Sequence, residues 1–193
     1  MQKNPVPPDL DLARRTGLPA PLRTLIDEFP RAGWEENPNY SHLIAFWLEK
    51  HLSFRQLVAQ LDADARAVLD GNEDAEIYKR KLQRFGSMLI GDLHGHHQIE
   101  DAHYFPVMTR LDTGASSGFD ILERDHDQMD GLLNGLVESA NGVLQSPGPR
   151  IIDKVAGFKR TLDAFAPLLD RHLSDEEELV VPVLLKYAPA EFR

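Results

Sequence analysis

The sequence repeats one pair of side chains that are typical metal ligands. His96 and Glu100 stand four residues apart, and so do His172 and Glu176. Four residues make about one turn of an α-helix, so each pair puts an imidazole nitrogen and a carboxylate oxygen on one helix face. Each pair could therefore contribute two ligands to the same cation.

The repetition extends to the residues around the pairs. Pro106 and Pro182 each follow the glutamate by six residues, and the lone upstream histidines His51 and His126 precede the pairs by 45 and 46 residues. A single His-x3-Glu is a weak signal, and hydrogen-bonded core histidines would not explain the matched spacing. The sequence therefore predicts a metal site built from two similar halves, with the ligands His51, His96, Glu100, His126, His172 and Glu176.

The residue types indicate which cation such a site would hold. Each of these side chains lies in a stripe of apolar residues, where an unpaired carboxylate is costly to bury, and Lys and Arg fall mostly on the outer faces. Mixed imidazole and carboxylate ligands suit iron, manganese or zinc. Six ligands exceed what one four-coordinate structural zinc uses. We expect two ions bridged by the two glutamates, with an open position for a small molecule such as dioxygen.

Further candidates lie in the same stretch of chain. One histidine stands seven residues after His96, which returns it to the same helix face, and a tyrosine follows Glu100 by one turn. His97 and Asp101 form a rival pair, rotated by about 100° around the helix from His96 and Glu100. The proline spacing favours His96 and Glu100 over this pair. These candidates, as ligands or as partners of ligands, are His103, Tyr104, His97 and Asp101. A ligating histidine usually donates its other nitrogen to a carboxylate, for which the candidates are Asp92, Asp101, Asp125 and Asp175.

Composition bounds the class of protein. The chain has 193 residues, enough for one domain, and a net charge of −10, which argues against binding to nucleic acid or anionic membranes. It has no cysteine, so thiolate sites and disulfides are excluded. No apolar run is long enough to span a membrane, and the first residues lack an apolar signal core. We expect a cytoplasmic protein.

Periodicity predicts the elements that position these ligands. Apolar residues recur every three or four positions over about 39–70, 74–111, 119–145 and 151–186, without a strand pattern. Short turns join these segments, which predicts an all-α fold, an up-down-up-down four-helix bundle over residues 40–187. A Pro-rich N-terminal extension, residues 1–39, should pack on it, and 188–193 form a tail. Irregularities are expected at Pro106, Pro167 and Pro182.

The motifs together resemble the hemerythrin-like (HHE cation-binding) domain family. The resemblance covers roughly residues 40–187 and implies a four-helix bundle with a non-haem di-iron centre bridged by two carboxylates. It assigns the same six side chains to the metals. Its carrying motifs are Leu48-Glu49-Lys50-His51, His96-His97-Gln98-Ile99-Glu100-Asp101 with Phe105-Pro106, Asp125-His126, and His172-Leu173-Ser174-Asp175-Glu176-Glu177-Glu178 with Pro182.

One departure from the family concerns the third helix. Oxygen-carrying hemerythrins have two histidines one turn apart there, whereas His126 has Leu122 four residues before it and Asp130 four residues after it. A water, Asp130 or a residue of the second helix could fill the gap. The departure weakens the case for a plain oxygen carrier.

Three functions follow as alternatives from the resemblance and the residues. The first is a di-iron protein that binds dioxygen or a related small oxidant, as sensor, store or scavenger. The second is an enzyme that processes peroxide or nitric oxide, with His103 and Tyr104 as proton donors. The third is a metal-stabilised regulatory or interaction module, whose protein partner the sequence does not identify. Two iron ions are the expected cofactor, with manganese or zinc possible.

Overall fold

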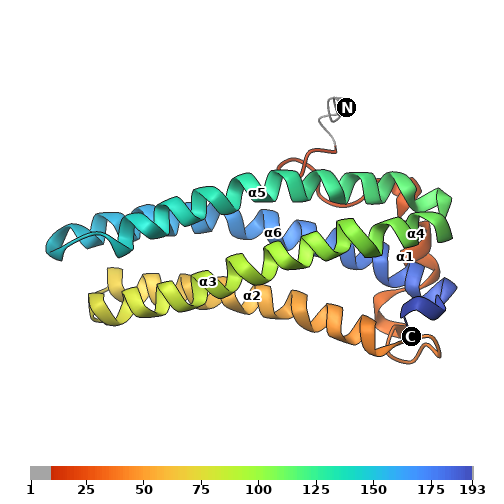
Figure 1. Cartoon of the computed structure of the whole chain (residues 1–193), viewed down its shortest axis with the longest axis horizontal. Coiled ribbons are helices and arrows are strands. Elements are labelled where there is room, and N and C mark those ends of the chain that lie inside the picture. The colour runs from red at the N-terminus through yellow and green to blue at the C-terminus, as the bar shows by residue number, and fades with distance from the viewer. Residues whose placement is uncertain (1–9, 193) are drawn as a thin grey trace. The chain divides into compact units, whose positions relative to one another are not determined.

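A computed structural model describes residues 10–192, and every regular element in that range is helical (Figure 1). The prediction of an all-helical chain is therefore confirmed for the described residues. The first prolines of the extension, Pro5, Pro7 and Pro8, lie outside this range. No helix in the described part of the chain is long and apolar enough to cross a membrane.

Four helical segments carry the candidate ligands. They match the four periodic segments of the sequence: α2 (His42–Leu69), α3 (Ala75–Ile99) with its continuation, α5 (Ser116–Leu144) and α6 (Ile151–Tyr187). The continuation of α3 is a π-helical turn, η3 (Glu100–Tyr104), followed by α4 (Phe105–Leu111). The shorter elements are η1 (Ala20–Leu22), α1 (Thr24–Glu28), η2 (Arg31–Gly33), η4 (Thr113–Ala115), η5 (Gly148–Arg150) and η6 (Ala190–Phe192).

Local chemistry sets the ends of α2. The Ser41 hydroxyl accepts a hydrogen bond from the backbone N–H of Ile44 at 3.4 Å, which caps the first turn. At the other end Gly71 adopts φ +73°, a left-handed conformation that glycine reaches without steric cost. The helix therefore ends where the sequence predicts.

The three prolines behave differently. Pro106 is confirmed as the site of an irregularity, because the π-helical turn lies directly before it. A proline ring inside a helix clashes with the carbonyl four residues earlier, here that of Ala102, and the wider π turn relieves this clash. Neither Pro167 nor Pro182 interrupts its helix, since α6 runs through both. Buried neighbours on both sides of each proline, such as Leu169 and Val181, hold that helix in place.

The chain divides into two compact units. Unit 1 lies within Met1–Lys50, Ile99–His126 and Asp170–Arg193, and unit 2 comprises His51–Gln98 and Asp127–Leu169. The boundaries fall inside the long helices rather than at loops. The separate division of the sequence into 1–39, 40–187 and 188–193 stays a prediction.

Unit 1 contains the N-terminal extension, and its apolar core includes residues of that extension. Leu18, Leu22, Leu25 and Trp34 are buried together with side chains of α2, α4, α5 and α6. The Trp34 indole N–H donates to the carbonyl of Phe29 at 2.8 Å. The part of the extension that the structure describes is therefore packed against the helices of its own unit.

Unit 2 consists of four helix segments with an apolar interior. Lys81 on α3 contacts Asp64 on α2 at 3.1 Å, and Lys159 on α6 contacts Asp62 on α2 at 2.8 Å. The interior is aliphatic and aromatic, with Phe54, Leu61, Leu82, Leu89, Leu133, Leu136, Val155, Phe158, Leu162 and Phe165 all buried.

Candidate metal site

Two buried carboxylates form the centre of the candidate site in unit 1. The Glu100 and Glu176 side chains are both 0% exposed, come from η3 and α6, and each offers one oxygen within 4.8 Å of the other's. Burial raises the pKa of Glu100 to about 8, against a lowering by the hydrogen bond with Glu176. Two acids this close cannot both be ionised at low cost unless a cation lies beside them.

Two histidines of unit 1 face these carboxylates. The Nε2 atom of His126 lies 3.6 Å from Glu100 Oε2, and the Nε2 atom of His172 lies 3.5 Å from Glu176 Oε2. The two imidazole rings have centroids 5.0 Å apart. Both rings therefore present the same nitrogen to the glutamates.

The other nitrogen of each ring contacts an aspartate. His126 Nδ1 lies 2.8 Å from Asp101 Oδ1, and His172 Nδ1 lies 3.3 Å from Asp125 Oδ2. An aspartate that accepts a hydrogen bond from Nδ1–H keeps the proton on Nδ1, and the lone pair of Nε2 is then free to bind a metal. Two of the four aspartates that the sequence offered for this role, Asp101 and Asp125, thus lie where a ligating histidine needs them.

Arg15, a residue of the extension, contacts Asp125 and a further buried aspartate, Asp175. Its side chain is 1% exposed; its Nε donates to Asp175 at 2.7 Å and its Nη1 to Asp125 at 2.8 Å. Its Nη2 donates to the second oxygen of Asp125, so that pair is bidentate. Burial raises the pKa of Asp125 although Arg15 acts to lower it. Arg15 thereby neutralises acids that adjoin the candidate ligands His126 and Glu176.

In unit 2 the histidines of α2 and α3 meet. The Nε2 atoms of His51 and His96 lie 3.0 Å apart, with ring planes at 89°. Phe54 packs on His96 with ring centroids 5.3 Å apart, so the pair lies against apolar surface. His97, the next residue on α3, is 3% exposed.

Two groups of these side chains could each hold a metal ion. One group comprises two histidines and two glutamates, and the other comprises three histidines. The first is His51, His96, Glu100 and Glu176, and the second is His97, His126 and His172. All six ligands expected from the sequence occur in these groups, with His97 as the seventh member. Nitrogen and carboxylate donors of this kind fit a cation such as iron, manganese or zinc.

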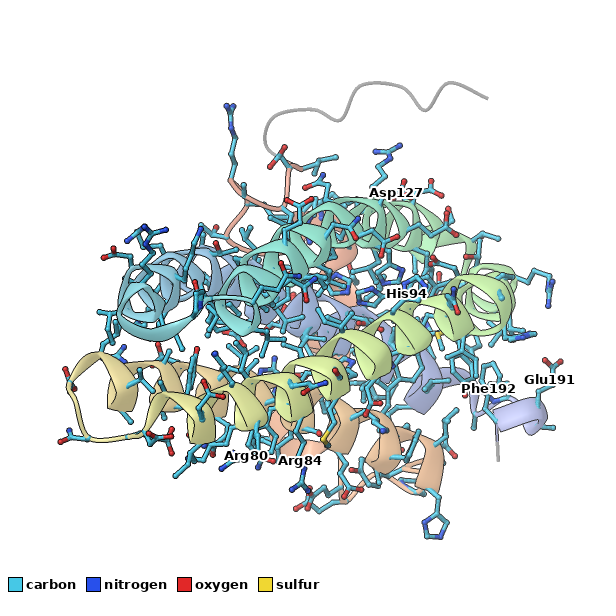
Figure 2. The ribbon with its side chains drawn as sticks, turned by 60° about the vertical axis from the view of Figure 1, so that its left-hand side comes forward. Arg80, Arg84, His94, Asp127, Glu191 and Phe192 are labelled. Carbon is cyan, nitrogen blue, oxygen red and sulfur yellow. The ribbon has the colours of Figure 1, made fainter. Side chains whose placement is uncertain are left out.

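Four further candidates lie outside both groups: Asp101, which contacts His126, and the three that follow. His103 is exposed and lies within the π turn, whose wider winding directs side chains differently from a regular α-helix. Asp130 is exposed and lies 3.5 Å from His94, which Figure 2 labels on α3. Tyr104 is half-buried, with ring centroids 5.1 Å from Trp47 and 5.2 Å from Phe192. Phe192 lies in η6, which ends the described chain (Figure 2).

The structure brings two residues to the site that the sequence marks weakly or not at all, Arg15 and His97. Arg15 is buried and is an exception to the expectation that Lys and Arg lie mostly on the outer faces. No local signal marks Arg15, since its partner Asp125 is 110 residues away. His97 was visible as a second histidine beside His96, and a residue of the second helix was one option for the gap on the third helix.

Comparison with known proteins gives one match. The model of the hemerythrin HHE cation-binding domain matches residues 42–184, which span the four ligand-bearing helical segments. No curated protein and no solved structure matches the sequence. The match covers well over half of the chain and all members of both candidate groups. The chain therefore belongs to the hemerythrin HHE cation-binding domain family.

Proposed function

We propose that this chain is a non-haem di-iron protein that binds dioxygen or a related small oxidant, as sensor, store or scavenger. The proposal includes an up-down-up-down bundle and a cytoplasmic location, as expected from the sequence. The observation that carries it is the pairing of two fully buried carboxylates, Glu100 and Glu176, each faced by an imidazole nitrogen. Two iron ions would supply reversible redox chemistry there.

The residues of the chain have distinct roles in this proposal. Glu100 and Glu176 would hold and neutralise the cations as carboxylate donors, and the histidines would supply neutral nitrogen donors. Asp101 and Asp125 hold His126 and His172 with Nδ1 protonated and Nε2 turned to the glutamates. Buried aromatic rings limit access of water to the imidazoles. Phe54 packs on His96, and Phe105 stacks on His126 with ring centroids 5.6 Å apart.

The test of this proposal has two stages. Elemental analysis of protein purified from its own cells should find close to two iron atoms per chain. Protein loaded with ferrous iron without oxygen should then gain a charge-transfer absorption band on exposure to air. Full iron loading with no spectral change in air would contradict the proposal.

The second candidate, an enzyme that processes peroxide or nitric oxide, is favoured by the position of Tyr104. Tyr104 follows Glu100 by four residues and its ring packs on Trp47 and Phe192, and its phenol is the proton donor that this candidate requires. Turnover of hydrogen peroxide that Tyr104→Phe reduces at unchanged metal content would support this reading. A third outcome, unfolding on chelation without any redox response, would favour a metal-stabilised interaction module.

A further inference from the structure

The described part of the extension contacts the turn of α6 that carries Glu176. We name residues 10–41 the N-terminal strap. Its Arg15 pairs with Asp175, the residue before Glu176, and its Arg31 pairs with Glu177, the residue after it, at 2.6 Å. The strap therefore places a positively charged arginine side chain on each side of the candidate ligand Glu176.

The contact through Arg15 reaches a second candidate ligand. The same guanidinium binds both oxygens of Asp125, and Asp125 Oδ2 contacts Nδ1 of His172. The fork geometry of a guanidinium restricts the carboxylate to one orientation. The orientation of the His172 ring thus depends on a carboxylate that a strap residue holds in place.

The buried charges of this region are balanced in part by a residue of the strap. Asp125 and Asp175 are 1% and 0% exposed, and Arg15 contacts both. Arg171 on α6 also pairs with Asp175 and donates to the carbonyl of Thr16 in the strap at 2.8 Å. Without Arg15, Asp125 would be a buried carboxylate without its guanidinium, an arrangement that proteins rarely tolerate.

We propose that Arg15 is a positioning residue of the metal centre, so that docking of the strap and binding of metal are linked equilibria. Each state favours the other: the docked strap orients His172 and neutralises the acids beside Glu176, and a bound cation stabilises that same arrangement. Thermodynamic linkage requires the two effects to be equal in size. The strap thereby becomes the part of the chain that responds to metal occupancy.

This inference rests on the proposed metal binding but is tested separately. In the full chain, ferrous iron affinity is measured without oxygen by competition with a chelator, and strap docking by hydrogen exchange of peptides from residues 16–34. Arg15→Gln should weaken iron binding by about tenfold or more, the range for residues that orient metal ligands. Loading the wild-type chain with iron should slow strap exchange by a similar factor.

Two variants control for general effects. Arg14→Gln changes the exposed neighbouring arginine and should leave iron affinity and strap exchange unchanged. Arg15→Lys keeps the positive charge but loses the planar guanidinium that binds both oxygens of Asp125. Its iron affinity should therefore lie between those of Arg15→Gln and the wild type. Exchange of peptides from the α2–α3 turn in unit 2 should not change in Arg15→Gln, which separates a local effect from loss of the fold.

Each outcome decides the matter. The inference is overturned if Arg15→Gln binds iron as tightly as the wild type does. It is also overturned if iron does not change hydrogen exchange of the strap in the wild type. Either result leaves the proposed function intact. Absence of iron binding by the wild type would instead overturn the proposed function. If Arg15→Gln fails to fold, the wild-type exchange measurement alone still decides between linked and independent strap docking.

Discussion

At the scale of single residues, the candidate site depends on the side chains that face its carboxylates. His126 and His172 each turn Nε2 toward a glutamate and Nδ1 toward an aspartate. His97 joins these two in a group of three imidazoles. A group of three donors has little redundancy, so loss of one histidine should affect the metal it holds.

The first prediction concerns His97. His97→Ala leaves two of the three imidazoles in its group, so the metal bound per chain should fall from about two to about one. The matched control is His94→Ala, an exposed histidine of the same helix, which should retain full metal content. Metal analysis after loading and desalting measures both. Equal metal content in the two variants would argue that His97 is not a ligand.

The second prediction concerns pH and Glu100. Burial raises the pKa of Glu100 from 4.5 to about 8, so between these values the metal-free native state holds a proton that the unfolded state has lost. The contribution of Glu100 to the free energy of unfolding should therefore fall as pH rises from about 5 to about 8.

Urea unfolding with a chelator present, at pH 5.5 and pH 7.5, measures this effect. Other groups also titrate, so the relevant quantity is the difference between the wild type and Glu100→Gln. Relative to the wild type, the free energy of unfolding of Glu100→Gln should be higher at pH 7.5 than at pH 5.5. No shift would mean that the carboxyl of Glu100 titrates in the native protein as it does in the unfolded chain.

At the scale of elements, close packing decides which small residues are required. Gly118 at the start of α5 is buried, and a Cβ there would lie 2.7 Å from a methyl carbon of Leu179 on α6, which is 0% exposed. Gly135 lies in the same helix with nothing within 4 Å of the equivalent position. One helix thus contains a glycine that packing requires and another that packing does not.

The third prediction uses this pair. Gly118→Ala should lower the free energy of unfolding by about 1–3 kcal/mol, because the buried leucine has little room to move. Gly135→Ala should instead raise it by up to about 1 kcal/mol through helix propensity. Chemical denaturation of both variants measures whether each substitution raises or lowers the free energy of unfolding. A stabilising Gly118→Ala would show that Leu179 repacks without cost.

The fourth prediction concerns the phenol of Tyr78 on α3. Its hydroxyl is buried and has no hydrogen-bond partner among the residues that the structure describes. Burial, followed by the charges of Asp64 and Glu73, raises the pKa of Tyr78. Tyr78→Phe removes an unpaired polar group and should stabilise the protein by about 1 kcal/mol.

The control for Tyr78 is a tyrosine with a hydrogen bond. Tyr187 donates from its hydroxyl to Asp112 at 3.0 Å, so Tyr187→Phe should not stabilise. Thermal unfolding measures both variants, with about 2–4 °C expected per kcal/mol in a chain of this size. A melting temperature lowered by Tyr78→Phe would indicate a hydrogen bond of this hydroxyl in solution.

At the scale of the whole molecule, the candidate ligands come from helices that are distant in sequence. Members of the two groups belong to α2, α3, η3, α5 and α6. A cation bound to such groups is bound only by the folded chain, so its binding free energy adds to the stability of the fold.

The fifth prediction is that metal raises the melting temperature. At a free metal concentration about 1,000 times the dissociation constant, the gain is about 4 kcal/mol, or roughly 10 °C. The double variant Glu100→Gln with Glu176→Gln should lose this response, because it lacks both buried carboxylates of the candidate site. Differential scanning calorimetry with and without metal measures the shift. A melting temperature unaffected by metal in the wild type would mean that the site binds no cation.

The sequence by itself determined the helices and the spacing of the ligand pairs. Helical periodicity and the position of His96 relative to Glu100, or of His172 relative to Glu176, are local properties of consecutive residues. Repetition of the local pattern was enough to indicate a metal site and the family.

Only the tertiary structure decided how the site is completed. Arg15 meets Asp125 across 110 residues of chain, a contact that no local period records. His103 is exposed within the π turn at Glu100–Tyr104, a departure from regular helix directly before Pro106 that the helical period of the sequence does not record. Packing between segments far apart in the chain brings such residues to the ligands or takes them away, and that packing is non-local.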